Sequence, residues 1–463
     1  MKKTIAISLI ASALLFASNS DVNSLTIDYT NNINNESSVE DSKVHQGKTN
    51  IKGSIVENVT LKKSTNGNTI SGVDIEGSTV EQARFIITDA NASSSTADGI
   101  SIESDNTITN GIIKDGSTVR QTYTEIKGGS TVQGLTLKTI NEIKELDSDA
   151  SDINKSTVDQ GILIVEGEST VVDFKQDATN TLEDTDAYDA NLTQNSIIVK
   201  GGSTITSFKN GDTGGTSISN TMSNVSATNG AKVTQNTNTF DNAEINGLTS
   251  TQSNTITNVD VDQNVITQGN IEITGSEIKD FDVKFTNEIK NLTIIGEGST
   301  EQGILIVTDS NATGSSDADV FEIEATNKLL DTDSVSGSSI VQSKTSIIGS
   351  EGGHSIVTDL KLKHTNTIES STADGAIDNN LSKATISQAE TIITNSTVNS
   401  LEQDFTNDVK QVEISDSSLS QGYTTITSSD VDDLKISQIN TVDNSSIKED
   451  STVTQGKTNI EGD

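Results

Sequence analysis

A short motif that ends in glutamine recurs along the whole chain, and its spacing constrains the fold more than any other feature. One copy reads STVTQG, and aligned variants include STVEQA, STVDQG, VITQG and SSLSQG. Successive glutamines lie 36, 39, 39, 34, 41, 33, 34, 40, 46, 33 and 34 residues apart, so the basic unit has about 33 residues and longer units carry insertions. Twelve copies of one landmark predict a repeat architecture. The glutamines are Gln46, Gln82, Gln121, Gln160, Gln194, Gln235, Gln268, Gln302, Gln342, Gln388, Gln421 and Gln455.

A second landmark, N-x-I/V/L, follows several of these glutamines at an interval of 19 or 20 residues. A V-x-x-L-x-L/I element lies between the two landmarks, as in Val132–Leu137. Three elements in a constant order indicate that every unit has the same local structure. The asparagines of this second landmark are Asn141, Asn180, Asn254, Asn287, Asn407 and Asn440.

The alternation of apolar residues changes phase at fixed places in the unit. In VITQGNIEI, Ile266 and Gln268 share one parity, whereas Ile271 and Ile273 have the other, so the phase changes at Gly269. The phase changes again within VDDLKI. Because one residue of slip sends every side chain of a strand to the opposite face, such places predict bends or bulges. Each unit is expected to hold about three short strands joined by bends.

The composition is too polar for a thick core and favours strands. Only 31% of the residues are hydrophobic, and the chain has no proline and no cysteine. Ile, Val and Leu alternate with Thr in short runs, which is typical of strands. We therefore predict an all-β protein, a β-solenoid (β-helix) of about 12 coils with loop insertions. Stacked coils would place the glutamines and asparagines in ladders, where each amide bonds to the next and is not buried unpaired.

The first 20 residues have the layout of a secretory signal peptide. Two lysines precede an apolar run, and small polar residues follow it. We expect a signal peptide over residues 1–20, an N-terminal polar segment over 21–40 and the repeat domain over 41–463. No later stretch reaches the roughly 20 apolar residues of a transmembrane helix. The protein is expected to be bacterial and secreted, in the extracellular space or at the cell surface.

Charge and loop composition limit the partners. A net charge of −37 argues against nucleic acid, which requires stripes of Lys and Arg. Two similar insertions, Thr88–Gly99 and Thr308–Asp319, are rich in small and acidic residues and are expected to be surface loops. Their carboxylates could hold Ca²⁺, but neither matches an EF-hand loop, so solvated loops without a cofactor are the favoured interpretation.

No catalytic constellation is evident in the sequence. Some right-handed β-helices are polysaccharide-degrading enzymes, which need local clusters of charged and aromatic residues. Here the only arginines are Arg84 and Arg120, and the four tyrosines are far apart in sequence. The three histidines do not recur, and His45 is expected to be an exposed strand residue because its position varies between units. We therefore expect no enzymatic activity.

With its signal peptide layout, lack of Cys and Pro, and regular Gln and Asn in Ser/Thr-rich strand repeats, the chain resembles the curli-type functional amyloid subunits. These are secreted β-solenoid proteins of bacterial biofilm fibres. The resemblance covers Val44 to Ile460 as an architecture, although the Q-x-G-x-G-N core of curli units is absent. It implies an exported subunit that stacks through Gln/Asn ladders, with secretion or nucleator proteins as further partners.

Two functional hypotheses follow. The first is a structural subunit of an extracellular fibre or biofilm matrix, a homopolymer formed by head-to-tail stacking. The hexapeptide QGKTNI occurs at Gln46–Ile51 and at Gln455–Ile460, and we interpret it as the opening strand and corner of the first and last units, with the last coil unfinished. The alternative is a monomeric or surface-attached adhesin that binds glycans or cells through its insertion loops.

Overall fold

The computed structural model describes residues 10–11, 14–15, 21–53, 55–93, 100–144, 153–210, 218–295, 297–313, 321–335, 337–350, 353–370 and 379–461. The chain divides into two compact units, residues 1–226 with 231–236, and residues 227–230 with 237–463. Strands make up 83% of the structure, and the described residues contain no helix. None of these residues forms a helix that could cross a membrane.

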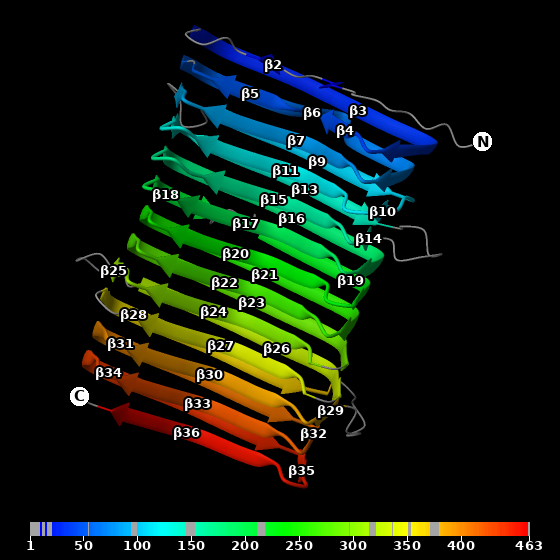
Figure 1. Cartoon of the computed structure of the whole chain (residues 1–463). Helices are drawn as coiled ribbons and strands as arrows, with labels where there is room; N and C mark the ends of the chain where they lie inside the picture. Colours follow the sequence, from blue (N-terminus) through cyan, green and yellow to red (C-terminus); the bar gives the residue numbers. More distant parts are fainter. Residues whose placement is uncertain are drawn as a thin grey trace. The chain divides into compact units, whose positions relative to one another are not determined.

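The first unit consists of two parallel sheets, and each strand pairs with its counterpart in the next coil. We call them the glutamine sheet and the asparagine sheet, after the landmark that each contains (Figure 1). The glutamine sheet contains β1 (Ile10–Ala11), β2 (Leu14–Leu15), β4 (Lys43–Gln46), β5 (Thr49–Lys52), β7 (Thr79–Thr88), β11 (Thr118–Lys127), β15 (Thr157–Val165) and β17 (Asn191–Lys200). The asparagine sheet contains β3 (Asp21–Glu40), β6 (Ile55–Glu76), β8 (Asn91–Ser93), β9 (Ile100–Thr109), β10 (Ile113–Lys114), β12 (Thr131–Gln133), β13 (Leu135–Lys144), β14 (Ile153–Asn154), β16 (Thr170–Tyr188) and β18 (Thr204–Asn210).

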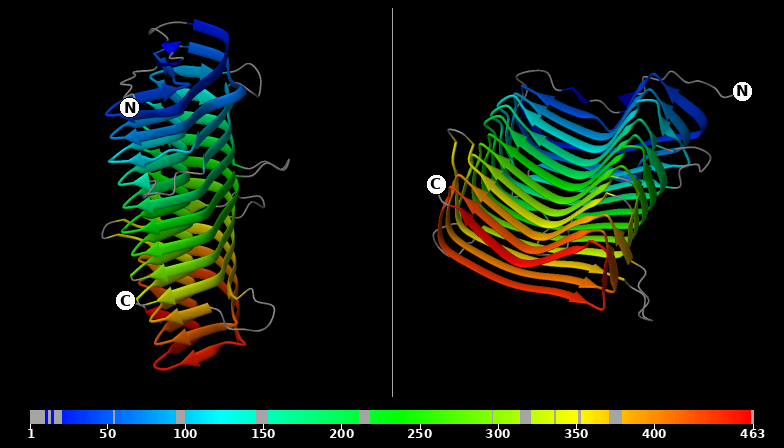
Figure 2. Two further views of the ribbon diagram at one scale, coloured as in Figure 1. Left: turned by 90° about the vertical axis from the view of Figure 1, so that its right-hand side faces the viewer. Right: turned by 60° about the horizontal axis from the view of Figure 1, so that its bottom comes forward.

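The second unit has the same two sheets (Figure 2). Its glutamine sheet contains β22 (Val265–Thr274), β24 (Ser299–Thr308), β27 (Ser339–Ile348), β30 (Thr385–Thr394), β33 (Ser418–Thr427) and β36 (Thr452–Glu461). Its asparagine sheet contains β21 (Glu244–Asp262), β23 (Glu277–Ile295), β25 (Asn311–Thr313), β26 (Phe321–Val335), β28 (Ser355–Glu369), β29 (Asn379–Ser382), β31 (Ser396–Lys410), β32 (Val412–Ser415), β34 (Asp430–Asp443) and β35 (Ser446–Lys448). Strands β19 (Ile218–Thr228) and β20 (Lys232–Asp241) have residues in both units.

The predicted all-β solenoid is confirmed. The described residues form about 10 turns with a mean repeat of about 37 residues, which is the 33-residue unit lengthened by its insertions. The pairing keeps the landmarks in register, because Gln121 pairs with Gln82 on one side and with Gln160 on the other. Columns of aliphatic side chains fill the space between the two sheets, as with Val80, Val119 and Val158, each at most 2% exposed. The thin core therefore consists of rows that run from coil to coil.

The bends lie where the phase changes predict them. Gly269 has φ +67°, and Asp433, in VDDLKI, has φ +48°. A left-handed residue shifts the alternation of the strand by one position, so that the apolar side chains after the bend still face the core. The expected three short strands per unit differ from what is observed, because strands of the asparagine sheet continue through their bends. Strand β23 spans 19 residues and includes two left-handed residues, Asp280 and Asn291.

Residues 21–40, expected to be a polar segment outside the repeats, form strand β3 of the asparagine sheet. Strand β3 pairs in parallel with β6, and Leu25 and Ile27 are in register with Val59 and Leu61. The alternation of apolar residues among many asparagines is sufficient for a strand in this sheet. The two copies of QGKTNI lie in β4–β5 and in β36. If each coil is counted from its strand in the asparagine sheet, such as β3, the hexapeptide belongs to the second part of the coil and does not open it.

The two insertions expected to be surface loops begin as strands. Asn91–Ser93 form β8, which pairs with β6 and β12, and Asn311–Thr313 form β25, which pairs with β23 and β28. The tracts 94–99 and 314–319, which contain most of the acidic residues proposed for Ca²⁺, lie outside the described residues. The signal peptide remains a prediction, although β1 and β2 of this segment pair with β4 and β5.

Candidate functional site

The landmark glutamines of the first unit form a continuous ladder of side-chain hydrogen bonds. Gln82 Nε2 donates to Gln46 Oε1 at 2.8 Å, and Gln121 Nε2 donates to Gln82 Oε1 at 2.9 Å. The bonds from Gln160 to Gln121, Gln194 to Gln160 and Gln235 to Gln194 are 2.7, 2.9 and 2.8 Å long. Every amide in this ladder is at most 1% exposed. Each glutamine thus donates toward the N-terminal end of the stack.

The second unit repeats this ladder with the same direction. Gln302, Gln342 and Gln388 each donate to the preceding glutamine at 2.8, 2.9 and 2.8 Å. The ladder continues from Gln421 to Gln388 at 2.8 Å and from Gln455 to Gln421 at 2.6 Å. Because all of these amides except that of Gln455 are buried, one bond between each pair of coils replaces the water that they lose.

A second bond fixes the orientation of the glutamine amides. Besides the ladder bond, Nε2 donates to the carbonyl oxygen of the residue after a ladder asparagine in the next coil. Gln121 reaches Glu142 O at 3.2 Å, and Gln342 reaches Thr367 O at 3.2 Å. If the amide were turned over, its own oxygen would face that carbonyl oxygen. The backbone therefore sets the direction of the glutamine ladder and ties three successive coils together.

The asparagine landmarks form a second ladder in the facing sheet. In the first unit, bonds from Nδ2 to Oδ1 join Asn31, Asn68, Asn106, Asn141, Asn180 and Asn220 in chain order at 2.7 to 2.9 Å. In the second unit they join Asn254, Asn287, Asn327, Asn366, Asn407 and Asn440 at 2.7 to 2.9 Å. These asparagines donate toward the C-terminal end, opposite to the glutamines.

Half of these asparagines were missed at the sequence level. For five of them the interval from the preceding glutamine is between 22 and 26 residues, because insertions lengthen it beyond the 19 or 20 used as a landmark, and Asn31 precedes the first landmark glutamine. The signal that finds them is N-x followed by an aliphatic residue or Met, as in Asn106-Thr107-Ile108, whatever the interval. The missed residues are Asn31, Asn68, Asn106, Asn220, Asn327 and Asn366.

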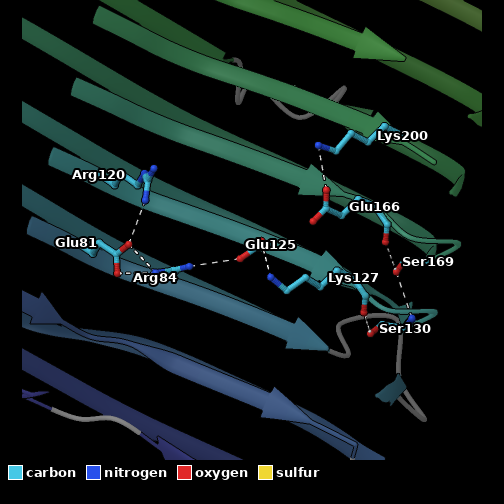
Figure 3. A network of polar contacts seen from close by, with 9 residues as sticks. All are labelled: Glu81, Arg84, Arg120, Glu125, Lys127, Ser130, Glu166, Ser169 and Lys200. Atoms are coloured by element: carbon cyan, nitrogen blue, oxygen red, sulfur yellow. Dashed lines mark hydrogen bonds and ion pairs between the residues drawn. The ribbon is translucent and has the colours of Figure 1, made fainter. Parts of the chain in front are cut away.

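Serine hydroxyls form a further row at a corner of the coils. Ser130 N donates to Ser169 Oγ at 3.2 Å, and Ser169 N donates to Ser203 Oγ at 3.3 Å. Ser169 Oγ in turn donates to Glu166 O at 2.8 Å (Figure 3). Each corner hydroxyl thereby satisfies a carbonyl of its own coil and an N–H of the preceding coil.

The outer face of the glutamine sheet in the first unit carries a cluster of charges around Glu81 (Figure 3). The carboxylate is 1% exposed and lies 2.7 Å from Arg84 Nη1 and 3.3 Å from Arg120 Nη1. His45 Nδ1 lies 2.6 Å from Glu81 Oε2. Burial alone would raise the pKa of Glu81, but the hydrogen bond and charge of Arg84 outweigh it and hold this pKa below its ordinary value.

Both arginines of the chain also flank one aromatic ring. The guanidinium carbons of Arg120 and Arg84 lie 4.7 and 5.6 Å from the centroid of the Tyr123 ring. Burial raises the pKa of this tyrosine. The sequence showed no local cluster of charged and aromatic residues, but all five residues of this one stand one residue before or two residues after a landmark glutamine. That common offset, combined with the register, is the signal that brings them together.

Two of the three histidines, His45 and His364, are less exposed than a surface histidine. His45 was expected to be exposed, but its side chain is 14% exposed because it packs against Glu81. Burial lowers its pKa. His364 lies in the core of the second unit at 3% exposure and stacks on Phe405, with ring centroids 5.1 Å apart. Neither ring nitrogen has a hydrogen-bond partner, and burial lowers its pKa to about 3.

The described residues contain no group of three or more His, Cys, Asp or Glu that could hold a metal ion. No family model, no curated protein and no solved structure matches this chain. The ladders can bind one coil to another, because each landmark side chain has an amide donor and an amide acceptor that point in opposite directions along the stack.

Proposed function

We propose that the protein is a structural subunit of an extracellular amyloid-like fibre or biofilm matrix, a homopolymer in which chains stack coil on coil and head to tail. The amide ladders carry this proposal, because within each unit the coils that contain the landmarks bind one another through the same groups. A coil of a second copy would present the same donors and acceptors, so no additional binding chemistry is required. Bacterial secretion and involvement of secretion or nucleator proteins belong to the same proposal.

The coil formed by β34 and β36 gives further support. Ile460 takes the position that Ile126 and Ile393 have in their coils, where these residues are 0% exposed, yet Ile460 is 67% exposed. Ile447 is 47% exposed, whereas its register partner Ile414 is 0% exposed. Core positions and ladder amides thus lie open on this face. A second copy would bury both kinds of group together, which is the combination that stabilises each internal contact.

Electron microscopy and fibre diffraction of the purified protein, freed of residues 1–20, test the proposal. We expect unbranched fibres with a reflection at about 4.8 Å along the fibre axis. Ile460→Lys should raise the concentration needed for assembly, whereas the control Glu461→Lys, on the outer face, should change it little. Monomers that persist at high concentration would contradict the proposal.

The adhesin alternative depends on the insertions Thr88–Gly99 and Thr308–Asp319, which lie partly outside the described residues. Deletion of both separates the two functions. A fibre subunit should still assemble, whereas an adhesin should lose its binding to cells or glycans.

A further inference from the structure

The first unit holds two short strands at the edge that the proposed stacking would use. Strand β1 pairs with β4, with Ala11 in register with Gln46, and β2 pairs with β5, with Leu14 in register with Thr49. Both lie within the predicted signal peptide. On their other side, β4 and β5 pair with β7.

We propose that strands β1 and β2 regulate self-assembly, because they occupy the edge of β4 and β5 at which β36 of a second copy would bind. This inference rests on the proposed function and adds a way in which assembly is regulated. A strand has two hydrogen-bonding edges, and β7 already takes one edge of β4 and β5. The segment and the second copy therefore exclude one another.

The second copy would make the more extensive contact. Strand β36 pairs with β33 through nine residue pairs, whereas β1 and β2 together make four. The register also favours the second copy. Ala11, the register partner of Gln46, has no side-chain amide, so the glutamine ladder does not continue into β1. Gln455 of a second copy would offer Oε1 to Gln46 Nε2 in the direction of every other bond of the ladder.

The opposite directions of the two ladders also decide which faces can meet. The β34–β36 face offers the donor Asn440 Nδ2 and the acceptor Gln455 Oε1. The β3–β5 face offers the acceptor Asn31 Oδ1 and the donor Gln46 Nε2. If the β34–β36 faces of two copies met, the asparagine ladders would bring donor against donor, and the glutamine ladders would bring acceptor against acceptor. Joining is therefore head to tail, and the β3–β5 face, where β1 and β2 lie, is required for every new contact.

The tether explains why so short a segment can compete. Strand β2 ends at Leu15, and β3, which begins at Asp21, holds the segment near β4 and β5 of the same chain. A segment held by a short link acts at an effective concentration on the order of millimolar. A second copy at micromolar concentration faces a competitor about 1,000-fold more concentrated. Cleavage of the predicted signal peptide removes this competitor, so that assembly begins only after export.

A cleavage-triggered experiment with the full chain tests this inference. A specific protease site replaces residues 18–20, the chain of 463 residues folds first, and light scattering at micromolar concentration follows assembly before and after cleavage. We expect at least a 10-fold faster rise after cleavage. Without cleavage, Leu14→Pro should release assembly to a similar extent, because proline breaks strand pairing. The control is Ile5→Pro, which lies outside β1 and β2 and should leave assembly slow.

The outcomes separate the regulation from the function. Equal assembly before and after cleavage would overturn the regulation and leave the proposed function standing. Slow assembly of Leu14→Pro together with fast assembly after cleavage would show that strand pairing is not the cause. No assembly after cleavage, with the strand signal in circular dichroism retained, would overturn the proposed function itself.

Discussion

The buried histidine of the second unit gives the most quantitative prediction. We expect His364→Phe to remove part of the acid sensitivity of the coils formed by β26, β28 and β31. The ring of His364 lies between Ala325 and Phe405 along the stack, and its pKa is lowered from 6.5 to about 3 by burial. Phenylalanine keeps the stacking on Phe405 and cannot be protonated.

The sign and magnitude follow from linkage. Above pH 6.5 the histidine is neutral in both the folded and the unfolded chain, and it does not make stability depend on pH. As the pH falls, the unfolded chain binds the proton first, so the free energy of unfolding drops by about 1.4 kcal/mol per pH unit. The drop ends near pH 3, where the folded chain also binds the proton. The whole loss amounts to about 5 kcal/mol.

Hydrogen exchange of backbone amides in β28 measures this locally, which matters because solenoids unfold in parts. The free energy of opening is compared at pH 7, 6, 5 and 4 for the wild type, His364→Phe and the control His354→Phe. His354 is exposed and its Nε2 lies 2.8 Å from Thr397 Oγ1. The difference between the wild type and His364→Phe should grow as the pH falls, while the control follows the wild type. Parallel curves for all three would refute the reasoning.

Three further predictions concern the ladders, the bends and the outer cluster. Gln302→Leu removes the bonds of Gln302 with Gln268 Oε1, Gln342 Nε2 and Lys328 O, and should lower the free energy of opening of β24 by about 3 kcal/mol, whereas Glu301→Gln should stay within about 0.5 kcal/mol. Gly269→Ala should cost about 2 kcal/mol in thermal or denaturant unfolding, because its Cβ would lie 2.9 Å from Phe285 Cδ1 in a left-handed backbone. Gly456→Ala, whose Cβ would meet no atom closer than 3.8 Å, should cost less, and equal costs would contradict the packing argument. Glu81→Gln removes the buried carboxylate that Arg84 and Arg120 share, so that they keep only their longer contacts to Glu125 and Asp159, and should cost about 2 kcal/mol by exchange in β7. Glu166→Gln, which removes the half-exposed partner of Lys200, should cost less than 1 kcal/mol.

The sequence was sufficient to predict the all-β solenoid and the bends, because both are set by periodicity. Identical landmarks such as Gln121 and Gln160 come into register only if the coils stack, and the phase change at Gly269 requires a left-handed residue. The segment 21–40 was misassigned because its few apolar residues lie among asparagines, which are poor strand formers in isolation. In the stack, β6 provides the pairing that the segment alone does not favour.

The outer cluster and the buried histidine were not accessible in the same way. The contact between Arg84 and Glu125 joins residues 41 positions apart and depends on the number of residues inserted between two coils. Once the glutamines fix the register, the neighbours of Arg84 can be read directly. The burial of His364 could not be predicted in this way. Inward positions are recognised by their apolar residues, and histidine is seldom fully buried.

The amide ladders have one more consequence, which concerns ionic strength. Neither ladder carries charge, and its members are buried except on the β34–β36 face, so dissolved ions do not screen the bonds between internal coils. The lysine–carboxylate pairs on the outer faces, such as Lys284 with Glu324, weaken in salt. A chain with net charge −37 would therefore keep the cohesion of its ladders from fresh water to brine, while salt weakens the outer ion pairs and reduces the repulsion between neighbouring molecules.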